Sequence, residues 1–350
     1  MPTPHHAVTI DATATEPGPL ATLATIGAPR CVDDALSVAG ALGRLVLDRP
    51  GSELVDRWEA LATLASLDVG AARVIEPHLD ALTMLQDARH DSLGDDEIGG
   101  LRWGVFAAEG GDEPLTATAK GDGTYSLTGV KPWCSLASRL DAALVTAHLG
   151  DSAERGLFAV RLGEGVQHDD TLWAARGLRE IPSGPVRFTD VEAVMIGEPG
   201  WYLRRPGFSW GGVGVAACWF GGAVGIARTV HASATTTDDA HVLAHLGAID
   251  ELLHSARRSL AEAATIAAGD STERAAADAR LTAKRVRATV ARASDEIIDR
   301  AHRALGPAPL ALDSAHAKRV ADLQLYVRQH HAERDQASLG SALAGGPAPW

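Results

Sequence analysis

The feature that most constrains the fold of this chain is its hydrophobic period, which changes twice along the sequence. From about residue 31 to 90, apolar residues recur at helical spacing. Between about 101 and 196 the segments become short, alternating and β-branched, and turn pairs such as Gly110-Gly111 separate them. From about residue 208 onward the helical spacing returns. The sequence therefore predicts helices, then strands, then helices.

The length of 350 residues exceeds that of a typical single domain. We expect an N-terminal tail and helical domain over 1–100, a central β domain over 101–198 and a C-terminal helical bundle over 199–350. These boundaries follow the two changes of period.

Glycine and proline indicate where helices end. The amphipathic stretch 275–306 should stop at Gly306-Pro307, because glycine favours a helix C-terminus and proline cannot continue a helix. Pro77 interrupts the apolar pattern of the first region, and we expect it to separate two helical runs.

Composition argues against several classes of protein. The formal net charge of -13 disfavours a nucleic-acid partner, because the phosphates would be repelled. Cys31, Cys134 and Cys218 are too scattered for a disulfide framework or a zinc site, which favours a reducing cytoplasm. The uncharged stretch 211–227 is rich in Gly and Ala, and we interpret it as a buried helix rather than a membrane span.

Isolated polar clusters give no further site. His241 and His245 lie one helical turn apart, but no third ligand is evident, so we predict no metal site. Arg204 and Arg205 could meet a phosphate, yet a solvated loop pair is the preferred interpretation. The sequence also lacks a Walker loop, a dinucleotide-binding glycine fingerprint and a nucleophile elbow.

Two segments in the middle of the chain carry a resemblance to a known family. GDGTYSLTGVKPWCSLASRLDAALVTAHL (121–149) and GLREIPSGPVRFTDVEAV (177–194) are similar to strand segments of the acyl-CoA dehydrogenase family. The C-terminal helical stretch also resembles that family's final two helices. The resemblance implies an α+β fold with an N-terminal helical domain, a central β-barrel-like domain and a C-terminal four-helix bundle. It further implies a homodimer or homotetramer, or a hetero-oligomer with a homologue.

The resemblance implies an FAD cofactor and places five residues beside it. Trp133 would stack on the flavin ring, and Ser135 would hold a hydroxyl near its reactive nitrogen, with Cys134 contributing backbone. Ala107 and Ala108 would lie at a strand end whose backbone flanks the flavin. The alternatives are a core position for Trp133 and a turn-capping role for Ser135.

The adenosine side of the cofactor is where the sequence departs from the family. The stretch 234–253 contains neither the Arg nor the aromatic residue that the family uses there. The family's glycine pair has become Gly306-Pro307. Loosely held flavin, FMN-like use and no flavin all remain open.

The stretch RQHHAERD (328–335) holds the most informative departure. In the family, the glutamate that removes the α-proton of an acyl thioester lies eight positions after an aspartate that matches Asp322, and here that position is His330. A neutral imidazole can accept a proton near pH 7, so His330 is the candidate base. The alternatives are a histidine like that of the flavin monooxygenases sharing the fold, and an idle helix-end pair with His331. Glu333 could substitute only if the helix shifted.

We therefore predict a flavin-dependent, acyl-CoA dehydrogenase-like oxidoreductase with His330 as base and an acyl-CoA thioester as substrate. One alternative is a flavin-dependent monooxygenase of the same fold. Another is a non-catalytic subunit that pairs with an active homologue. We predict no nucleic-acid or membrane partner.

Overall fold

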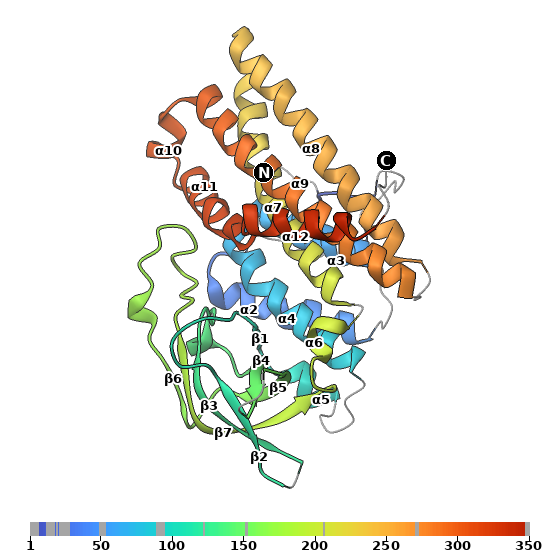
Figure 1. Cartoon of the computed structure of the whole chain (residues 1–350). Coiled ribbons are helices and arrows are strands. Elements are labelled where there is room, and N and C mark those ends of the chain that lie inside the picture. Colours follow the sequence, from blue (N-terminus) through green and yellow to red (C-terminus); the bar gives the residue numbers. More distant parts are fainter. Residues whose placement is uncertain are drawn as a thin grey trace.

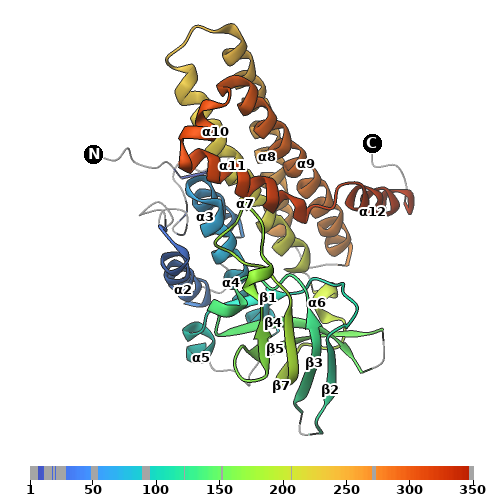
Figure 2. The same ribbon diagram turned by 90° about the vertical axis from the view of Figure 1, so that its left-hand side faces the viewer.

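The computed structural model separates a helical part from a strand-rich part, which lies at the lower end of Figure 1. It describes residues 7–11, 18, 20, 29–48, 54–88, 95–121, 123–150, 153–205, 207–269 and 273–346, with backbone only at 95–97 and 273–276. Figure 2 shows the helices of both ends of the sequence together above the strands.

The N-terminal helices pack on one another and on the bundle. They are α2 (Val32–Asp48), α3 (Leu54–Leu67), α4 (Val69–Asp87) and the short α5 (Asp95–Gly100). The side chain of Asp68 caps α4 by accepting a hydrogen bond from the Ala71 N–H at 2.9 Å. Pro77 lies inside α4, so the prediction that it separates two helices is wrong. The burial of most of this helix outweighs the one backbone bond that proline removes.

The strands form a closed barrel. They are β1 (Trp103–Phe106), β2 (Thr116–Ala119), β3 (Tyr125–Lys131), β4 (Ala142–Leu149), β5 (Arg155–Arg161), β6 (Val166–His168) and β7 (Val186–Ile196). Each of β4, β2, β3, β7 and β5 pairs with the next, and β5 pairs back to β4. Closure leaves the ring no free edge, and Leu127, Phe158 and Phe188 fill its core.

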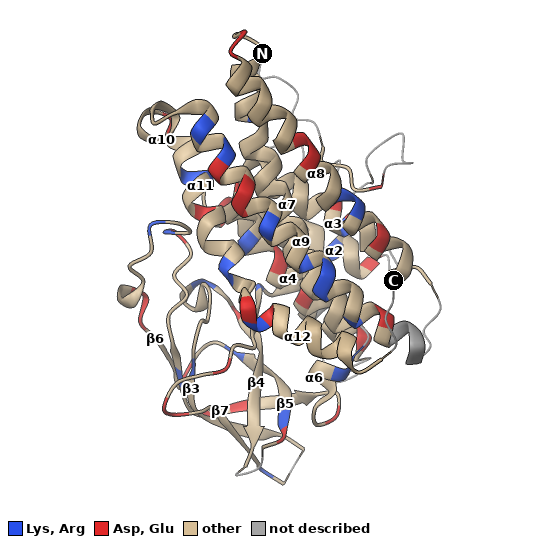
Figure 3. Cartoon of the chain, turned by 45° about the horizontal axis from the view of Figure 1, so that its top comes forward, with Lys and Arg blue, Asp and Glu red and all other residues tan. Residues whose placement is uncertain are grey.

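The C-terminal helices make up the other large core. They are α6 (Trp201–Arg204), α7 (Gly207–Ala234), α8 (Ala240–Ala267), α9 (Glu273–Leu305), α10 (Ala308–Leu312), α11 (Ser314–Tyr326) and α12 (Glu333–Ala344). The predicted stop of α9 is confirmed, since Gly306 follows it with φ of 66°. Figure 3 shows acidic and basic residues interspersed along these helices.

Helix α7 runs through the centre of the helical part. A side chain at Gly221 would come within 2.0 Å of the Ala62 carbonyl oxygen, so only glycine permits this close crossing with α3. By length and composition α7 is the one described helix that could cross a membrane, and 78% of its most apolar stretch is buried in the protein. The apolar sequence is accounted for by this burial.

Candidate functional site

Trp133 lies at the rim of the barrel, just after β3, and its side chain is open to solvent. The residue is 63% exposed and has a φ of 59°, which is unfavourable for an amino acid with a side chain. Backbone hydrogen bonds hold the strained turn, from Cys134 N–H to the Gly184 carbonyl at 2.9 Å and from Leu136 N–H to the Pro182 carbonyl at 2.8 Å. An indole kept in the open at a conformational cost is typical of a binding surface.

A second indole stands edge-on to the first. The ring of Trp173 lies 6.5 Å from that of Trp133, at 88°. Its own N–H donates to the Leu178 carbonyl at 3.0 Å. The two indoles therefore form one aromatic corner, of which the sequence predicted only Trp133.

Hydroxyl groups adjoin this corner. Ser135 Oγ lies 2.7 Å from Ser183 Oγ and accepts a hydrogen bond from Arg73 Nη2 at 2.8 Å. Cys134, which lies between Trp133 and Ser135 in the sequence, is buried. Its thiol donates a hydrogen bond to the Lys131 carbonyl, and burial raises the pKa of the thiol. Cys134 is thus suited to backbone contacts and not to nucleophilic chemistry.

Ala107 and Ala108 follow β1 and are half-buried. The next residue, Glu109, accepts a hydrogen bond from Lys131 Nζ at 2.9 Å and also pairs with Arg155 at 3.0 Å. Because Lys131 ends β3, this contact brings the loop after β1 beside the strand that leads to the aromatic corner.

His330 follows a 3-10 turn, Val327–Gln329, that extends α11. Its side chain is 8% exposed, and its Nε2 lies 4.0 Å from Asp335 Oδ2 without a hydrogen-bond partner among the described residues. Burial lowers the pKa of His330, so the imidazole is neutral near pH 7. His331 and Glu333 are exposed, which makes them weaker candidates for a sheltered base.

Arg73 connects the aromatic corner to the helix that leads to His330. Besides its bond to Ser135, the Arg73 guanidinium lies 5.6 Å from the centre of the Tyr326 ring, at the end of α11. Among the described residues, no hydrogen bond or ion pair joins His330 directly to Trp133 or Ser135. The structure thus brings residues 133–135 together. Arg73, which contacts Ser135, also contacts Tyr326, four positions before His330.

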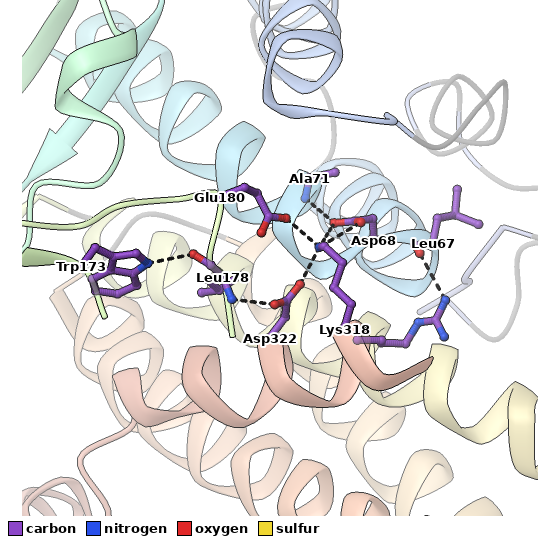
Figure 4. Close-up of polar contacts among 9 residues, drawn as sticks. Leu67, Asp68, Ala71, Trp173, Leu178, Glu180, Lys318 and Asp322 are labelled. Atoms are coloured by element: carbon purple, nitrogen blue, oxygen red, sulfur yellow. Dashed lines mark hydrogen bonds and ion pairs between the residues drawn. The ribbon is translucent and has the colours of Figure 1, made fainter. Parts of the chain in front are cut away.

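A cluster of charges around Lys318 fixes the loop that carries Trp173. Figure 4 shows Lys318 Nζ among Asp322 at 2.6 Å, Glu180 at 2.7 Å and Asp68 at 3.0 Å. Asp322 also accepts a hydrogen bond from the Leu178 N–H.

The loop approaches α11 closely at Gly177, where a side chain would come within 2.0 Å of the Ala321 carbonyl oxygen. Burial acts to lower the pKa of Lys318, but Asp68 and Asp322 attract its charge and raise the pKa above its ordinary value. The Lys318 cluster is therefore an anchor for the aromatic corner.

Among the described residues, Asp68, Glu180 and Asp322 are also the one group with spacing suited to a metal ion, and Lys318 Nζ lies among them. His241 and His245 are not part of such a group.

A separate cavity of about 410 Å³ lies where α3, α4, α6 and the start of α7 meet. Arg205 lines it, and its side chain is 2% exposed and paired with Asp80 at 3.3 Å. The prediction of a solvated loop pair is therefore wrong for Arg205, whereas Arg204 is exposed. The sequence could not reveal this, because Asp80 lies in another helix.

The barrel between N-terminal helices and a C-terminal bundle is the acyl-CoA dehydrogenase fold, which confirms the predicted fold class. The chain is similar to the dibenzothiophene monooxygenase TdsC from Paenibacillus sp. A11-2 in complex with FMN and indole, with a TM-score of 0.78 and 17% identity over 91% of this chain and 90% of that chain.

Two other solved structures share the fold. KijD3 in complex with FMN and a dTDP-linked amino-keto sugar has a TM-score of 0.75 and 20% identity over 89% of this chain and 86% of that one. Butyryl-CoA dehydrogenase from Megasphaera elsdenii has a TM-score of 0.76 and 17% identity over 89% of each chain. No match was found among protein-family models or among curated proteins.

Proposed function

We propose that this chain is a flavin-dependent monooxygenase of the acyl-CoA dehydrogenase fold. The observation that carries the proposal is the strained, 63% exposed indole of Trp133 beside the hydroxyl of Ser135. Structural neighbours that carry FMN, TdsC and KijD3, support it. A monooxygenase was one of the alternatives that the sequence offered, and we favour it here over acyl-CoA dehydrogenation.

The residues of the aromatic corner fit an isoalloxazine ring. Trp133 offers an open flat face, and the hydroxyls of Ser135 and Ser183 offer donors and acceptors to the ring's heteroatoms. Arg73 supplies a fixed positive charge beside those hydroxyls. A bound, reduced flavin would supply the electrons with which oxygen is activated. We favour FMN over FAD because 234–253 lacks the arginine and aromatic residue of the adenosine side.

His330 distinguishes a monooxygenase from a dehydrogenase in this proposal. The dehydrogenases that this chain resembles carry a glutamate where His330 lies, so the carboxylate that removes the α-proton is missing from that position, and burial lowers the pKa of the imidazole that replaces it. A neutral imidazole with an unpartnered Nε2 can instead orient a substrate through one hydrogen bond. Acyl-CoA dehydrogenation remains a second candidate because butyryl-CoA dehydrogenase shares the fold.

The first experiment measures flavin binding by fluorescence quenching. We expect FMN to bind, and Trp133→Ala to weaken binding at least tenfold while leaving the melting temperature nearly unchanged, because the indole is exposed. Leu312→Ala, which removes a side chain that is 86% exposed, is the control and should bind FMN normally. If neither FMN nor FAD bound, the proposal would be wrong and the non-catalytic alternative would be favoured.

The second experiment separates the two oxidoreductases. With a flavin reductase and oxygen supplied, a monooxygenase oxygenates its substrate, whereas a dehydrogenase bleaches its oxidised flavin on addition of an acyl-CoA without any reductant. We expect no bleaching. We also expect His330→Ala to lower oxygenation at least tenfold with FMN affinity within twofold of the native protein. Bleaching by an acyl-CoA would overturn the monooxygenase assignment.

Cytoplasmic location and a homodimer or homotetramer are also proposed, on the cysteine pattern and the family resemblance respectively.

A further inference from the structure

Four groups beside the aromatic corner form one chain of hydrogen bonds. Nη2 of Arg73 donates to Ser135 Oγ at 2.8 Å, and Ser135 Oγ lies 2.7 Å from Ser183 Oγ. Ser183 Oγ donates to the Ile181 carbonyl at 3.2 Å. The chain thus runs from α4 to the loop that precedes β7, and both of its serines are half-buried.

The two ends of this chain determine which way its hydroxyl protons point. A guanidinium can only donate, so Arg73 occupies one of the two lone pairs of Ser135. A carbonyl can only accept, so Ile181 takes the single proton of Ser183. The short contact between the two serines then needs the proton of Ser135. The hydroxyl of Ser135 is left with one lone pair, and with no proton, for a ligand.

The opposite direction would leave the chain incomplete. If Ser183 donated to Ser135 instead, the Ile181 carbonyl would lose this donor, and Ile181 is only 1% exposed. The proton of Ser135 would at the same time have no acceptor within the chain. The loss of one such hydrogen bond costs about 1 kcal/mol. The direction from Arg73 to Ile181 is therefore favoured.

Reduction of an isoalloxazine ring reverses the hydrogen-bonding character of its N5. In oxidised flavin N5 is bare and accepts a hydrogen bond, whereas in reduced flavin N5 carries a hydrogen and donates. A lone pair on Ser135 therefore complements N5 of reduced flavin, and it faces another lone pair on N5 of oxidised flavin. N3 of the ring carries a hydrogen in both states, so a contact with N3 would not discriminate.

We propose that Ser183 is a positioning residue that fixes the hydroxyl of Ser135 as an acceptor facing N5, so that the site selects reduced over oxidised flavin. The inference rests on the proposed flavin function and deepens it. A site with this preference takes flavin that has been reduced elsewhere. The reaction that supplies its cofactor is then a flavin reduction by a separate enzyme.

The charge of Arg73 is a second influence on the redox preference, because reduced flavin readily ionises to an anion. Glu76 Oε2 lies 3.7 Å from Arg73 Nη1 and balances part of that charge. A substitution at Ser183 changes the direction of the hydroxyl chain and leaves both charges in place. Ser183 therefore separates the effect of direction from the effect of charge.

The test compares the affinity of the full chain for FMN in its two redox states by titration calorimetry. Oxidised FMN is titrated in air, and FMN reduced with dithionite is titrated under nitrogen. We expect reduced FMN to bind at least tenfold more tightly, because a hydrogen bond replaces a contact between two lone pairs. A tenfold ratio places the midpoint potential of bound FMN about 30 mV above that of free FMN, which spectroelectrochemistry measures independently.

Variants assign the preference to the hydroxyl chain. Ser183→Ala frees the proton of Ser135 for N5 of oxidised FMN, so the ratio of the two affinities should fall at least tenfold, mainly through tighter binding of oxidised FMN. Ser294→Ala removes another serine hydroxyl that donates to a carbonyl, that of Val290 in α9, and as the matched control should keep the native ratio. If Ser183→Ala does not fold, Ser135→Ala serves instead and should lower the ratio at least fivefold.

The redox preference and the flavin function can fail separately. Equal affinity of the native protein for the two redox states would refute the preference and leave the flavin function in place. A native ratio retained in the serine variant would refute the role of the hydroxyl chain in the same way, even if both affinities fell together. Absence of FMN binding in either redox state would instead refute the flavin function itself.

Discussion

The Lys318 cluster and the charged residues that line the cavity between α3, α4, α6 and α7, Glu76 and Arg205 among them, differ in how many of their polar groups have partners. Lys318 Nζ lies within 3.0 Å of three carboxylates, and the second carboxylate oxygen of Asp322 accepts a hydrogen bond from the Leu178 N–H. In the cavity, Glu76 lies 3.7 Å from the guanidinium of Arg73, and Nε of Arg205 has no hydrogen-bond partner among the described residues.

This difference indicates a difference in role. An ionic group whose partners are all present gains little from a ligand, so the Lys318 cluster serves to hold the loop of Trp173 on α11. A buried donor that has no partner in the protein can be satisfied by water or by a ligand. The two groups therefore differ in polar satisfaction, although both contain acids from distant segments.

The largest effect is expected from removing the cation of the anchor. Lys318→Met leaves Asp322 buried without its partner and should lower the free energy of unfolding by about 3 kcal/mol, at the low end for a broken buried pair because Lys318 is 37% exposed. Urea denaturation measures it. Lys120→Met, which removes an exposed pairing with Glu192, is the control and should cost less than about 1 kcal/mol. Equal losses would mean that the Lys318 cluster is no anchor.

A smaller effect of opposite sign is expected in the cavity. Because the folded pKa of Glu76, about 7, exceeds its ordinary 4.5, the folded state retains a proton that the unfolded state loses. Stability should therefore fall as pH rises between these values. Glu76→Gln removes this penalty and should stabilise the protein by about 2 kcal/mol at pH 8 but very little at pH 4. A uniform loss of stability at both pH values would contradict this role.

The smallest effect is expected from metal ions. Since Lys318 Nζ lies among Asp68, Glu180 and Asp322, neither EDTA nor millimolar Ca²⁺ should move the melting temperature of the native protein by more than about 1 °C. Differential scanning fluorimetry measures the shift. A clear stabilisation by Ca²⁺ would show that the carboxylates bind an ion, and would contradict the role of the Lys318 cluster as an anchor alone.

Parts of the candidate site could be predicted because they are continuous in sequence. Trp133, Cys134 and Ser135 follow a strand pattern that resembles a known family, and their local backbone places the indole and the hydroxyl together. His330 could be singled out by its spacing from Asp322.

Other parts could not be predicted because their partners are far apart in the chain. Arg73 reaches Ser135 across 62 positions, and Arg205 meets Asp80 across 125. Nothing in the helical pattern of α4 distinguishes Arg73 or Glu76 from residues of a solvated face. The prediction that Pro77 separates two helices is wrong for a related reason. Local propensity contains no information on the packing that keeps α4 helical.

The sequence by itself determined the order of helices and strands, the glycine stop after α9 and the strand motif that carries Trp133, because each depends on the conformation of neighbouring residues. Only the tertiary structure decided which charges are satisfied and which are not. That depends on the distances between helices that meet from opposite ends of the chain, and the free energy of a buried charge depends on those distances far more than on residue type.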